Sequence, residues 1–320
     1  MTDGLADRFE RGFAGRVAVV TGGGSGMGRE LVRQLSADGC DVATCDVLLD
    51  NAEETAAICA AEGHPGAVLT HAADVSDESQ VLAFAAAVQA WRPHVNLLFN
   101  NAGIGAAGTI VGGDRAMWEK VFNVCWYGVY YNTLAFLPQL LRAPVGQLVN
   151  TSSVNGFFAS VGPETPHSAY SAAKFAVKGF TEALITDFAR NAPHVRVTVV
   201  MPGHVGTAIA NNTDKLLGLH DDLDKVRARY ASFGRDASRM SDDELRSRMK
   251  RRGDTFRDTA PTSAAEAASI ILEGVKRGHW RILVGSDAEL LDEMVRQDPT
   301  HAYDEDFYRF WVGQAGATPR

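Results

Sequence analysis

Short runs of β-branched and other apolar residues alternate in this chain with longer, alanine-rich stretches, and this alternation restricts the fold most strongly. The short runs predict strands at 16–21, 41–46, 67–71, 95–99, 146–151, 195–200 and 281–284. The longer stretches predict helices at 26–38, 51–62, 77–91, 114–141, 168–191 and 263–277. Parallel strands need crossover connections, usually helices, which cover both faces of the sheet. The pattern therefore predicts an α/β fold, a single doubly wound domain with a seven-stranded parallel sheet flanked by helices.

The chain has 320 residues, whereas α/β domains often need only about 200 to 250. We expect one domain at 1–285, interrupted by a helical excursion at about 208–260, and a C-terminal extension at 286–320, neither addition having a core of its own. Apolar residues at helical spacing predict amphipathic helices in the excursion, either a solvated insertion or a lid. They are Leu216, Leu217, Leu219, Leu223, Val226 and Tyr230. The aromatic residues near the chain end must pack on this domain or on a second subunit.

Charge and cysteine content exclude several classes of protein. A formal net charge of −8 leaves no basic face for a phosphate backbone, so we expect no nucleic-acid partner. The cysteines Cys40, Cys45, Cys59 and Cys125 lack zinc or redox spacing, which predicts a reduced, cytoplasmic protein without a metal site. The acidic N-terminus does not resemble an export signal. The charge-free run from 121 to 141 is long enough to cross a membrane, but its Asn, Thr, Pro and Gln residues favour a buried helix and no membrane partner.

A glycine-rich turn, TGGGSGMG at 21–28, joins the first predicted strand to the first predicted helix. Glycine allows a sharp turn and a close approach to a ligand, and the free N–H groups at a helix start attract a pyrophosphate. The position at the start of a β-α-β unit favours a dinucleotide site over a plain tight turn. The predicted contacts are Gly22, Gly24, Ser25, Gly26, Met27 and Gly28.

An acidic residue, Asp46, ends the second predicted strand 18 residues after Gly28 (46 − 28 = 18). A carboxylate at this place accepts hydrogen bonds from the adenosine ribose and repels a 2′-phosphate. Neither Ser25 nor Val47 supplies the positive charge that a 2′-phosphate needs, so the sequence favours NAD over NADP. The alternative is an aspartate that only forms a turn after a strand.

A tyrosine and a lysine, Tyr170 and Lys174, lie four residues apart and hence on the same face of a predicted helix. A nearby ammonium group stabilises tyrosinate, which makes the phenol a usable general acid or base. An amphipathic surface helix is the alternative explanation for this pair alone.

With four further segments, the chain resembles the short-chain dehydrogenase/reductase family. The turn matches T-G-x-x-x-G-x-G, residues 100–103 match N-N-A-G, and Asn123 matches the helix asparagine of the catalytic tetrad. TSSVNG at 151–156 resembles the catalytic serine segment, Tyr170 and Lys174 match Y-x-x-x-K, and PGHVGT at 202–207 resembles P-G-x-V-x-T. These six motifs follow family order between about 15 and 285. The resemblance implies a Rossmann-like catalytic domain and an NAD(P)-dependent oxidoreductase.

The resemblance also implies a role for each matched residue. Ser153 would hydrogen-bond the substrate oxygen, and Tyr170 would transfer its proton. Lys174 would hold the nicotinamide ribose, and Asn123 would anchor a water that links Lys174 to solvent. The remaining cofactor contacts would be Asp74, Val75, Asn101, Ala102, Gly103, Pro202, Gly203, Val205 and Thr207.

The spacing before the tyrosine departs from the family, because Ser153 precedes Tyr170 by 17 residues (170 − 153 = 17) instead of about a dozen. The extra residues predict a loop at 162–167, which leaves both Ser152 and Ser153 open as the catalytic serine. His167 is either an additional acid or base or a packing residue. Phe157 and its neighbour Phe158 predict an apolar substrate pocket, although they could be ordinary core residues.

These observations predict an enzyme that interconverts a secondary alcohol and a ketone on a hydrophobic skeleton. The resemblance implies a homodimer or homotetramer that pairs through the helix at 114–141 and the helix that carries Tyr170. The alternative is a regulatory NAD-binding protein without turnover, against which the complete set of catalytic residues argues. A nucleotide-sugar epimerase of the extended subfamily needs T-G-x-x-G-x-x-G, which Gly26 and Gly28 do not fit.

Overall fold

The computed structural model, which describes residues 9–105, 108–162 and 165–315, confirms the predicted α/β fold. A seven-stranded sheet has the order β3-β2-β1-β4-β5-β6-β9, and every pairing in it is parallel. Its strands are β1 (Val17–Thr21), β2 (Asp41–Asp46), β3 (Val68–Ala72), β4 (Leu97–Asn100), β5 (Gly146–Thr151), β6 (Val195–Pro202) and β9 (Arg281–Val284). The strand order reverses between β1 and β4, where doubly wound sheets bind ligands at the carboxyl ends of the strands.

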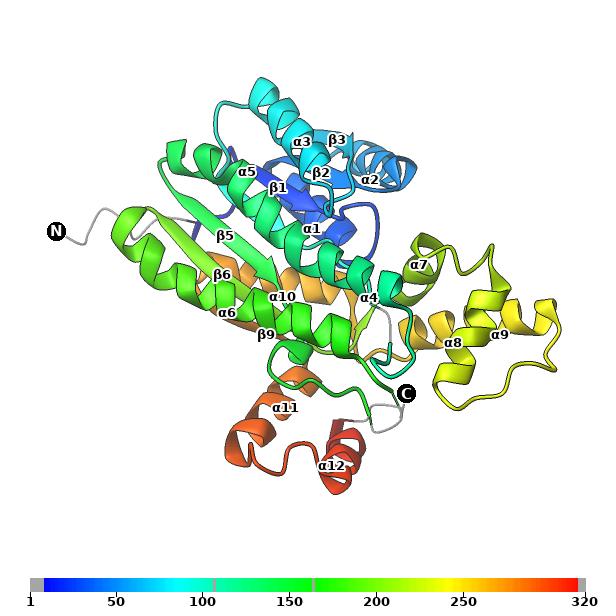
Figure 1. Ribbon diagram of the computed structural model, residues 1–320. Coiled ribbons are helices and arrows are strands. Elements are labelled where there is room, and N and C mark those ends of the chain that lie inside the picture. Colours follow the sequence, from blue (N-terminus) through cyan, green and yellow to red (C-terminus); the bar gives the residue numbers. More distant parts are fainter. Residues whose placement is uncertain (1–8, 106–107, 163–164, 316–320) are drawn as a thin grey trace.

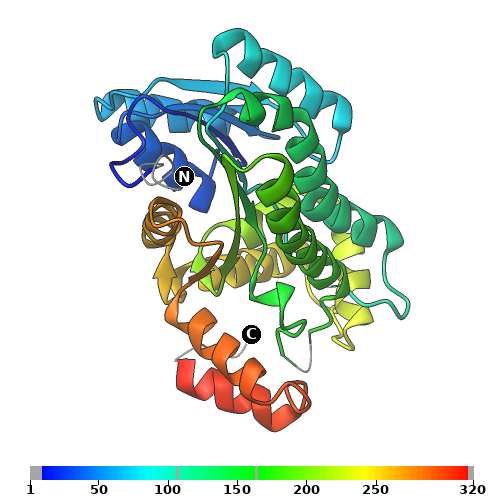
Figure 2. The same cartoon turned by 90° about the vertical axis from the view of Figure 1, so that its left-hand side faces the viewer.

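Helices cover both faces of the sheet (Figures 1 and 2). One face carries α1 (Gly26–Ala37), α2 (Leu49–Ala61) and α10 (Ala264–Lys276). The other carries α3 (Glu78–Trp91), α4 (Arg115–Phe122), α5 (Gly128–Arg142) and α6 (Ser168–Asn191). Each layer packs a separate apolar cluster against strands that are buried on both faces.

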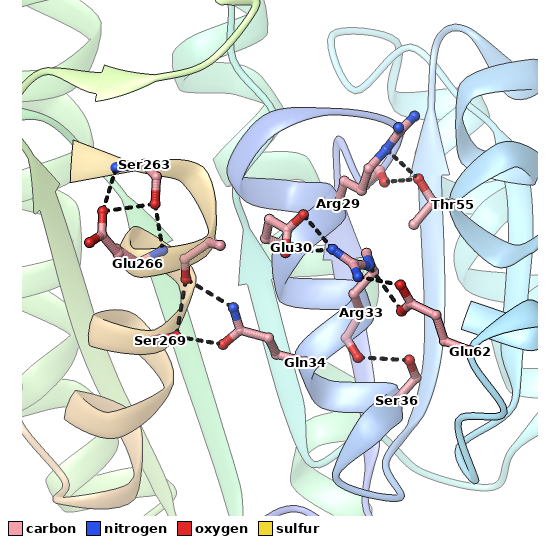
Figure 3. A network of polar contacts seen from close by, with 12 residues as sticks. Arg29, Glu30, Arg33, Gln34, Ser36, Thr55, Glu62, Ser263, Glu266 and Ser269 are labelled. Atoms are coloured by element: carbon pink, nitrogen blue, oxygen red, sulfur yellow. Dashed lines mark hydrogen bonds and ion pairs between the residues drawn. The ribbon is translucent and has the colours of Figure 1, made fainter. Parts of the chain in front are cut away.

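Polar contacts fix α1 between its two neighbours, as Figure 3 shows. Arg33 bonds to Glu30 on its own helix at 2.9 Å and to Glu62, just after α2, at 2.5 Å. On the opposite side, Gln34 accepts a hydrogen bond from Ser269 of α10 at 3.0 Å. Since α1 begins at the glycine turn, these contacts also hold the helix N-terminus in place.

The prediction of a single helix at 114–141 is wrong in one respect. A π-helical turn, Asn123–Tyr127, separates α4 from α5, and the N–H of Gly128 donates to the carbonyl of Asn123. Such turns occur mostly as single turns inside α-helices and frequently at functional sites. In the described part of the chain, no helix combines the length and apolar character needed to cross a membrane.

The excursion forms three helices, α7 (Ile209–Leu216), α8 (Leu223–Ser232) and α9 (Asp242–Asp258), which extend beyond the sheet in Figure 1. Two short strands at its base, β7 (Val205–Gly206) and β8 (Thr262–Ser263), pair and bring its two ends together. The expectation that the excursion lacks a core is wrong. A small apolar cluster joins α8 and α9, formed by Leu219, Leu223, Val226, Ala237, Leu245 and Met249.

The C-terminal extension forms α11 (Ser286–Gln297) and α12 (Glu305–Ala315), which pack on the turn after β5 (Figure 2). The Phe158 ring lies 5.2 Å from that of Tyr303 and 5.6 Å from that of Phe307, measured between centroids. The Tyr308 hydroxyl donates to the carbonyl of Val161 at 3.1 Å. These aromatic residues therefore pack on their own domain.

Candidate active site

The glycine turn takes a conformation that needs glycine at several positions. Gly22 and Gly26 have φ values of +71° and +53°, in the region that side chains other than glycine rarely adopt. A Cβ atom at Gly28 would lie 2.0 Å from the carbonyl oxygen of Gly22, so only glycine lets α1 approach the turn this closely. The turn thus presents the N-terminus of α1 at the carboxyl edge of the sheet, a natural place for an anion.

The segment after β4 is hydrogen-bonded to the end of β1. The hydroxyl oxygen of Thr21 accepts from the backbone N–H groups of Asn101 and Ala102, each at 3.0 Å. The Asn101 side chain donates back to the Thr21 carbonyl at 3.1 Å. These contacts hold the start of the glycine turn beside the N-N-A-G segment, at the point where the strand order reverses.

Asp46 lies at the end of β2 and holds the turn from the other side. One carboxylate oxygen accepts from the Gly24 N–H and the other from the Leu48 N–H, both at 3.0 Å. Burial raises the pKa of Asp46 above its ordinary value, and these hydrogen bonds offset the effect only in part. The residue therefore stabilises the turn and also presents a carboxylate to the adjacent cavity.

A cavity of about 240 Å³ lies beside the turn. Twelve of the predicted cofactor residues line it: Gly22, Ser25, Gly26, Met27, Gly28, Asp46, Asp74, Val75, Asn101, Ala102, Gly103 and Thr207. Gly24 does not line it and acts through its bond to Asp46.

Among the lining residues that lay outside the sequence prediction, two make polar contacts from distant helices. Asn212 of α7 donates to the Ser25 hydroxyl at 3.1 Å, so the excursion reaches over the turn. Lys120 of α4 bonds to Asp74 at 2.6 Å. Burial raises the pKa of Asp74, but hydrogen bonds from Lys120 and Ser76 outweigh it and keep the pKa below its ordinary value. No local pattern marks Asn212 or Lys120, because both reach the cavity from distant helices.

A larger cavity of about 530 Å³ adjoins the first, and Met27, Asn101, Gly103, Thr207 and Ile209 line both. The predicted catalytic residues Ser153, Tyr170 and Lys174 line the larger one. The remaining predicted cofactor residues, Pro202, Gly203 and Val205, also line it. Residues from β5, α6 and the segment after β6 thus meet at one cavity.

Lys174 is buried beneath Tyr170. Its side chain is only 2% exposed, and the ammonium donates to the carbonyl of Thr151 at 2.8 Å. The nitrogen lies 5.4 Å from the centroid of the Tyr170 ring. The His167 ring also packs against Tyr170, with its centroid 4.9 Å from that of the Tyr170 ring. Pro163 and Glu164, in the predicted loop between serine and tyrosine, lie outside the described residues.

The two candidate serines differ in their hydrogen bonds. The Ser152 hydroxyl donates to the carbonyl of Lys174 at 2.7 Å, which commits its hydrogen to α6. The Ser153 oxygen accepts from the Asn155 N–H at 3.1 Å, and this contact leaves the hydroxyl hydrogen able to donate. The geometry therefore favours Ser153 over Ser152 as the residue that can donate to a ligand.

Asn123 and Phe157 are absent from the described linings of both cavities. Asn123 begins the π-helical turn, and Cys125 of this turn lies beside Gly103, which also neighbours the Lys174 ammonium. Phe157 packs with the C-terminal extension and lies under the Arg281 guanidinium, 5.7 Å from its ring centroid. The structure thus places Phe157, predicted to contact substrate, in the packing against the C-terminal extension and not in the described lining of either cavity, and Phe158, 1% exposed, is a core residue.

The two additions to the domain supply nearly half of the described residues that line the larger cavity. The excursion supplies Leu219, Val226, Arg229, Tyr230, Phe233, Met249 and Arg252, and α12 supplies Tyr308, Trp311 and Val312. The helical spacing of Val226 and Tyr230 indicated a buried face, but it did not show what that face covers.

Comparison with known proteins agrees with this arrangement. Residues 16–217 match the family model of short chain dehydrogenases. The putative oxidoreductase SadH of Mycobacterium tuberculosis is 35% identical over 284 residues, which cover 89% of this chain and 91% of SadH. Levodione reductase of Leifsonia aquatica is 33% identical over 206 residues, covering 64% of this chain and 75% of that enzyme.

Among solved structures, a short chain dehydrogenase/reductase from Burkholderia phymatum in complex with NAD superimposes with a TM-score of 0.68. The two chains are 26% identical, and the match covers 96% of this chain and 97% of the other. The fold, the ordered motifs and these relatives agree that the chain belongs to the short-chain dehydrogenase/reductase family of NAD(P)-dependent oxidoreductases.

Proposed function

We propose that this protein is an NAD-dependent oxidoreductase that interconverts a secondary alcohol and a ketone on a largely hydrophobic skeleton. One observation carries the proposal: Ser153, Tyr170 and Lys174 line a single cavity that adjoins the cavity beside the glycine turn. A donor to the substrate oxygen, a proton-transfer group and a nucleotide cradle are thereby placed together.

The residues around the turn fit a dinucleotide. The N-terminus of α1 suits a pyrophosphate, and the Asp46 carboxylate suits the hydroxyls of an adenosine ribose while repelling a 2′-phosphate. Pro202, Gly203, Val205 and Thr207 would flank the nicotinamide, whereas Asp74 and Val75 would border the adenine. When bound, the cofactor accepts or supplies the hydride.

The protein's own part is to hold the substrate oxygen and to move its proton. The Ser153 hydroxyl donates to that oxygen and stabilises the negative charge that develops on it. The Tyr170 hydroxyl takes the proton during oxidation and returns it during reduction. The buried Lys174 ammonium, 5.4 Å from the centroid of the Tyr170 ring, binds the ribose hydroxyls.

Asn123 has an indirect role in this proposal, as the anchor of a water that connects Lys174 to solvent. Its support is the π-helical turn that starts at Asn123 and approaches the same glycine, Gly103, as the Lys174 ammonium. Single π-helical turns of this kind occur frequently at functional sites.

The test is the variant Tyr170→Phe, which removes one hydroxyl and keeps the ring. Wild type is screened with NAD and a panel of secondary alcohols at alkaline pH, following the absorbance of the reduced cofactor. Turnover should fall below detection in the variant, while NADH still binds. Tyr130→Phe on α5, outside both cavities, is the matched control. Retained turnover in Tyr170→Phe would refute the mechanism, and NAD binding without turnover of any alcohol by wild type would favour a regulatory protein.

We also propose that the protein forms a homodimer or homotetramer through α5 and α6. Large apolar side chains on these helices and the π-helical turn are exposed in the single chain, namely Tyr127, Leu134, Leu141 and Phe175. An exposed apolar surface of this kind is typical of a protein interface. Sedimentation equilibrium tests the proposal, and a monomer at micromolar concentration would contradict it.

A further inference from the structure

We propose that the substrate carries a carboxylate and that Arg229 and Arg252, on the wall formed by α8 and α9, bind it. The inference rests on the proposed alcohol and ketone chemistry at Tyr170, and it adds a substrate class to that chemistry. The observation behind it is a pair of arginines that share one aspartate inside the larger cavity.

The charge of the cavity contrasts with that of the whole chain. Among the lining residues that the structure describes, the cations include Lys174, Arg229 and Arg252, and the carboxylates are Asp214 and Asp287. The chain as a whole has a formal net charge of −8. A cationic cavity in an acidic protein selects an anionic ligand and draws it in from solution.

The arginine pair is built from three helices. Asp214 of α7 is 2% exposed and contacts Arg229 of α8 at 3.3 Å and Arg252 of α9 at 2.6 Å. The Arg229 side chain is 11% exposed. One carboxylate therefore faces two guanidinium groups, and one positive charge is left without a counter-charge in this cluster.

A purely structural role explains only part of this arrangement. A tie between helices needs one cation for one carboxylate, but here the buried Arg229 and the half-exposed Arg252 share a single carboxylate. Burial and repulsion from Arg252 lower the pKa of Arg229, so an anion that joined the pair would stabilise the charged form of Arg229. Each guanidinium has five N–H donors, enough to bind Asp214 and an incoming carboxylate together. A single uncompensated charge matches a carboxylate better than a doubly charged phosphate monoester.

The cofactor does not account for the pair. The described lining of the cavity beside the glycine turn includes neither Arg229 nor Arg252, and both line the cavity that contains Ser153 and Tyr170. At about 530 Å³ this cavity is in the range that holds a small-molecule ligand. An apolar skeleton can thus pass along Leu219, Val226 and Tyr230, with its oxygen at Tyr170 and its carboxylate at the arginines.

The experiment measures binding, so that it does not depend on turnover. The probes are 5-oxohexanoate, 7-oxooctanoate and 9-oxodecanoate, each compared with the methyl-terminated ketone of the same length (2-hexanone, 2-octanone and 2-decanone). Each is titrated calorimetrically into the protein with NAD, because a ketone and the oxidised cofactor cannot react. At the chain length that spans the cavity, the oxo acid should bind about tenfold or more tighter than its partner, as expected for charge-assisted hydrogen bonds.

Arg252→Gln is the test variant, because the Arg252 side chain is 45% exposed and tolerates exchange better than Arg229. It should lose most of the preference for the oxo acid and keep the affinity for the plain ketone. Arg252→Lys should retain part of the preference, since it keeps the charge without the fork-shaped donors. Arg246→Gln is the matched control, since Arg246 lies on the same helix, contacts Asp243 and does not line the cavity.

Three outcomes overturn the inference: oxo acids that bind no tighter than plain ketones at every length, oxo acids that do not bind, or a preference that survives in Arg252→Gln. The proposed chemistry is tested separately, by reduction of the plain ketones with NADH. If the plain ketones are reduced without any preference for oxo acids, the inference fails and the proposed function stands. If a tight, Arg252-dependent oxo acid site exists without turnover of any probe, the carboxylate site stands and the proposed function fails.

Discussion

Replacement of Asp46 by asparagine should shift the nucleotide preference towards NADP. The carboxylate lines the nucleotide cavity, and each of its oxygens accepts one backbone N–H. A unit charge on a 2′-phosphate about 4 Å away would be repelled by about 4 kcal/mol at an effective dielectric constant of about 20. Salt and solvent at the open rim reduce this to about 2 kcal/mol, equivalent to about a thirtyfold change in relative affinity. Asparagine removes the charge and therefore most of that factor.

The same exchange should also destabilise the turn. An asparagine can accept one of the two N–H groups from Gly24 and Leu48, but its own NH₂ then faces the other, leaving a donor without an acceptor. The expected cost is about 1 to 3 kcal/mol in the free energy of unfolding. The shift in nucleotide preference and the loss of stability thus have separate physical causes and separate readouts.

The assay measures dissociation constants for NADH and NADPH by fluorescence titration, with urea unfolding of each variant in parallel. Asp50→Asn is the control, since it removes an exposed charge from the start of α2, outside both cavities. The reasoning is refuted if wild type already binds NADPH more tightly. It is also refuted if the ratio of the two constants is the same in Asp46→Asn and wild type.

Three further predictions can be tested by measurement. Gly28→Ala should weaken NADH binding more than about tenfold, because the new Cβ would lie 2.0 Å from a carbonyl oxygen and displace α1. The control is Gly313→Ala, which should bind NADH normally because no atom lies within 4 Å of the new Cβ. Burial raises the pKa of Asp292, but hydrogen bonds, above all from Arg281, outweigh it and hold the pKa below its ordinary value. At pH values well above about 4, wild type should exceed Asp292→Asn by about 2 kcal/mol in the free energy of unfolding. This difference should disappear as the pH falls through the lowered pKa of Asp292, and urea unfolding at several pH values measures it. Burial raises the pKa of Cys45 to about 12, so this thiol should react with a thiol reagent only after unfolding, and rapid labelling of the native protein would contradict its burial.

The sheet could be predicted almost completely from the sequence. The bounds predicted at 41–46, 146–151 and 281–284 coincide with β2, β5 and β9. Parallel strands buried on both faces have continuous apolar runs, and glycine-rich or polar segments end these runs clearly. The same local chemistry explains why most of the predicted nucleotide contacts line the cavity beside the turn.

Features that depend on distant packing could not be predicted. The break in the helix at Asn123 changes the hydrogen-bond ladder without changing the apolar pattern. The apolar character of Phe157 indicated burial but not direction, and its side chain packs on the C-terminal extension instead of the cavity. The Asp214 cluster joins residues 15 and 38 positions apart, from three helices whose relative placement no local motif encodes.

The larger cavity is lined partly by the domain that matches the family and partly by the excursion and the C-terminal extension. This division determines which properties can be inferred from a relative. The family match ends at residue 217, whereas the wall residues of α8, α9 and α12 all come later. Identity within 16–217 is therefore informative about the reaction, while substrate range has to be compared at the wall positions. Mutagenesis confined to those positions would change which molecules enter while sparing the proton-transfer residues, so new substrate specificities could arise there without rebuilding the sheet.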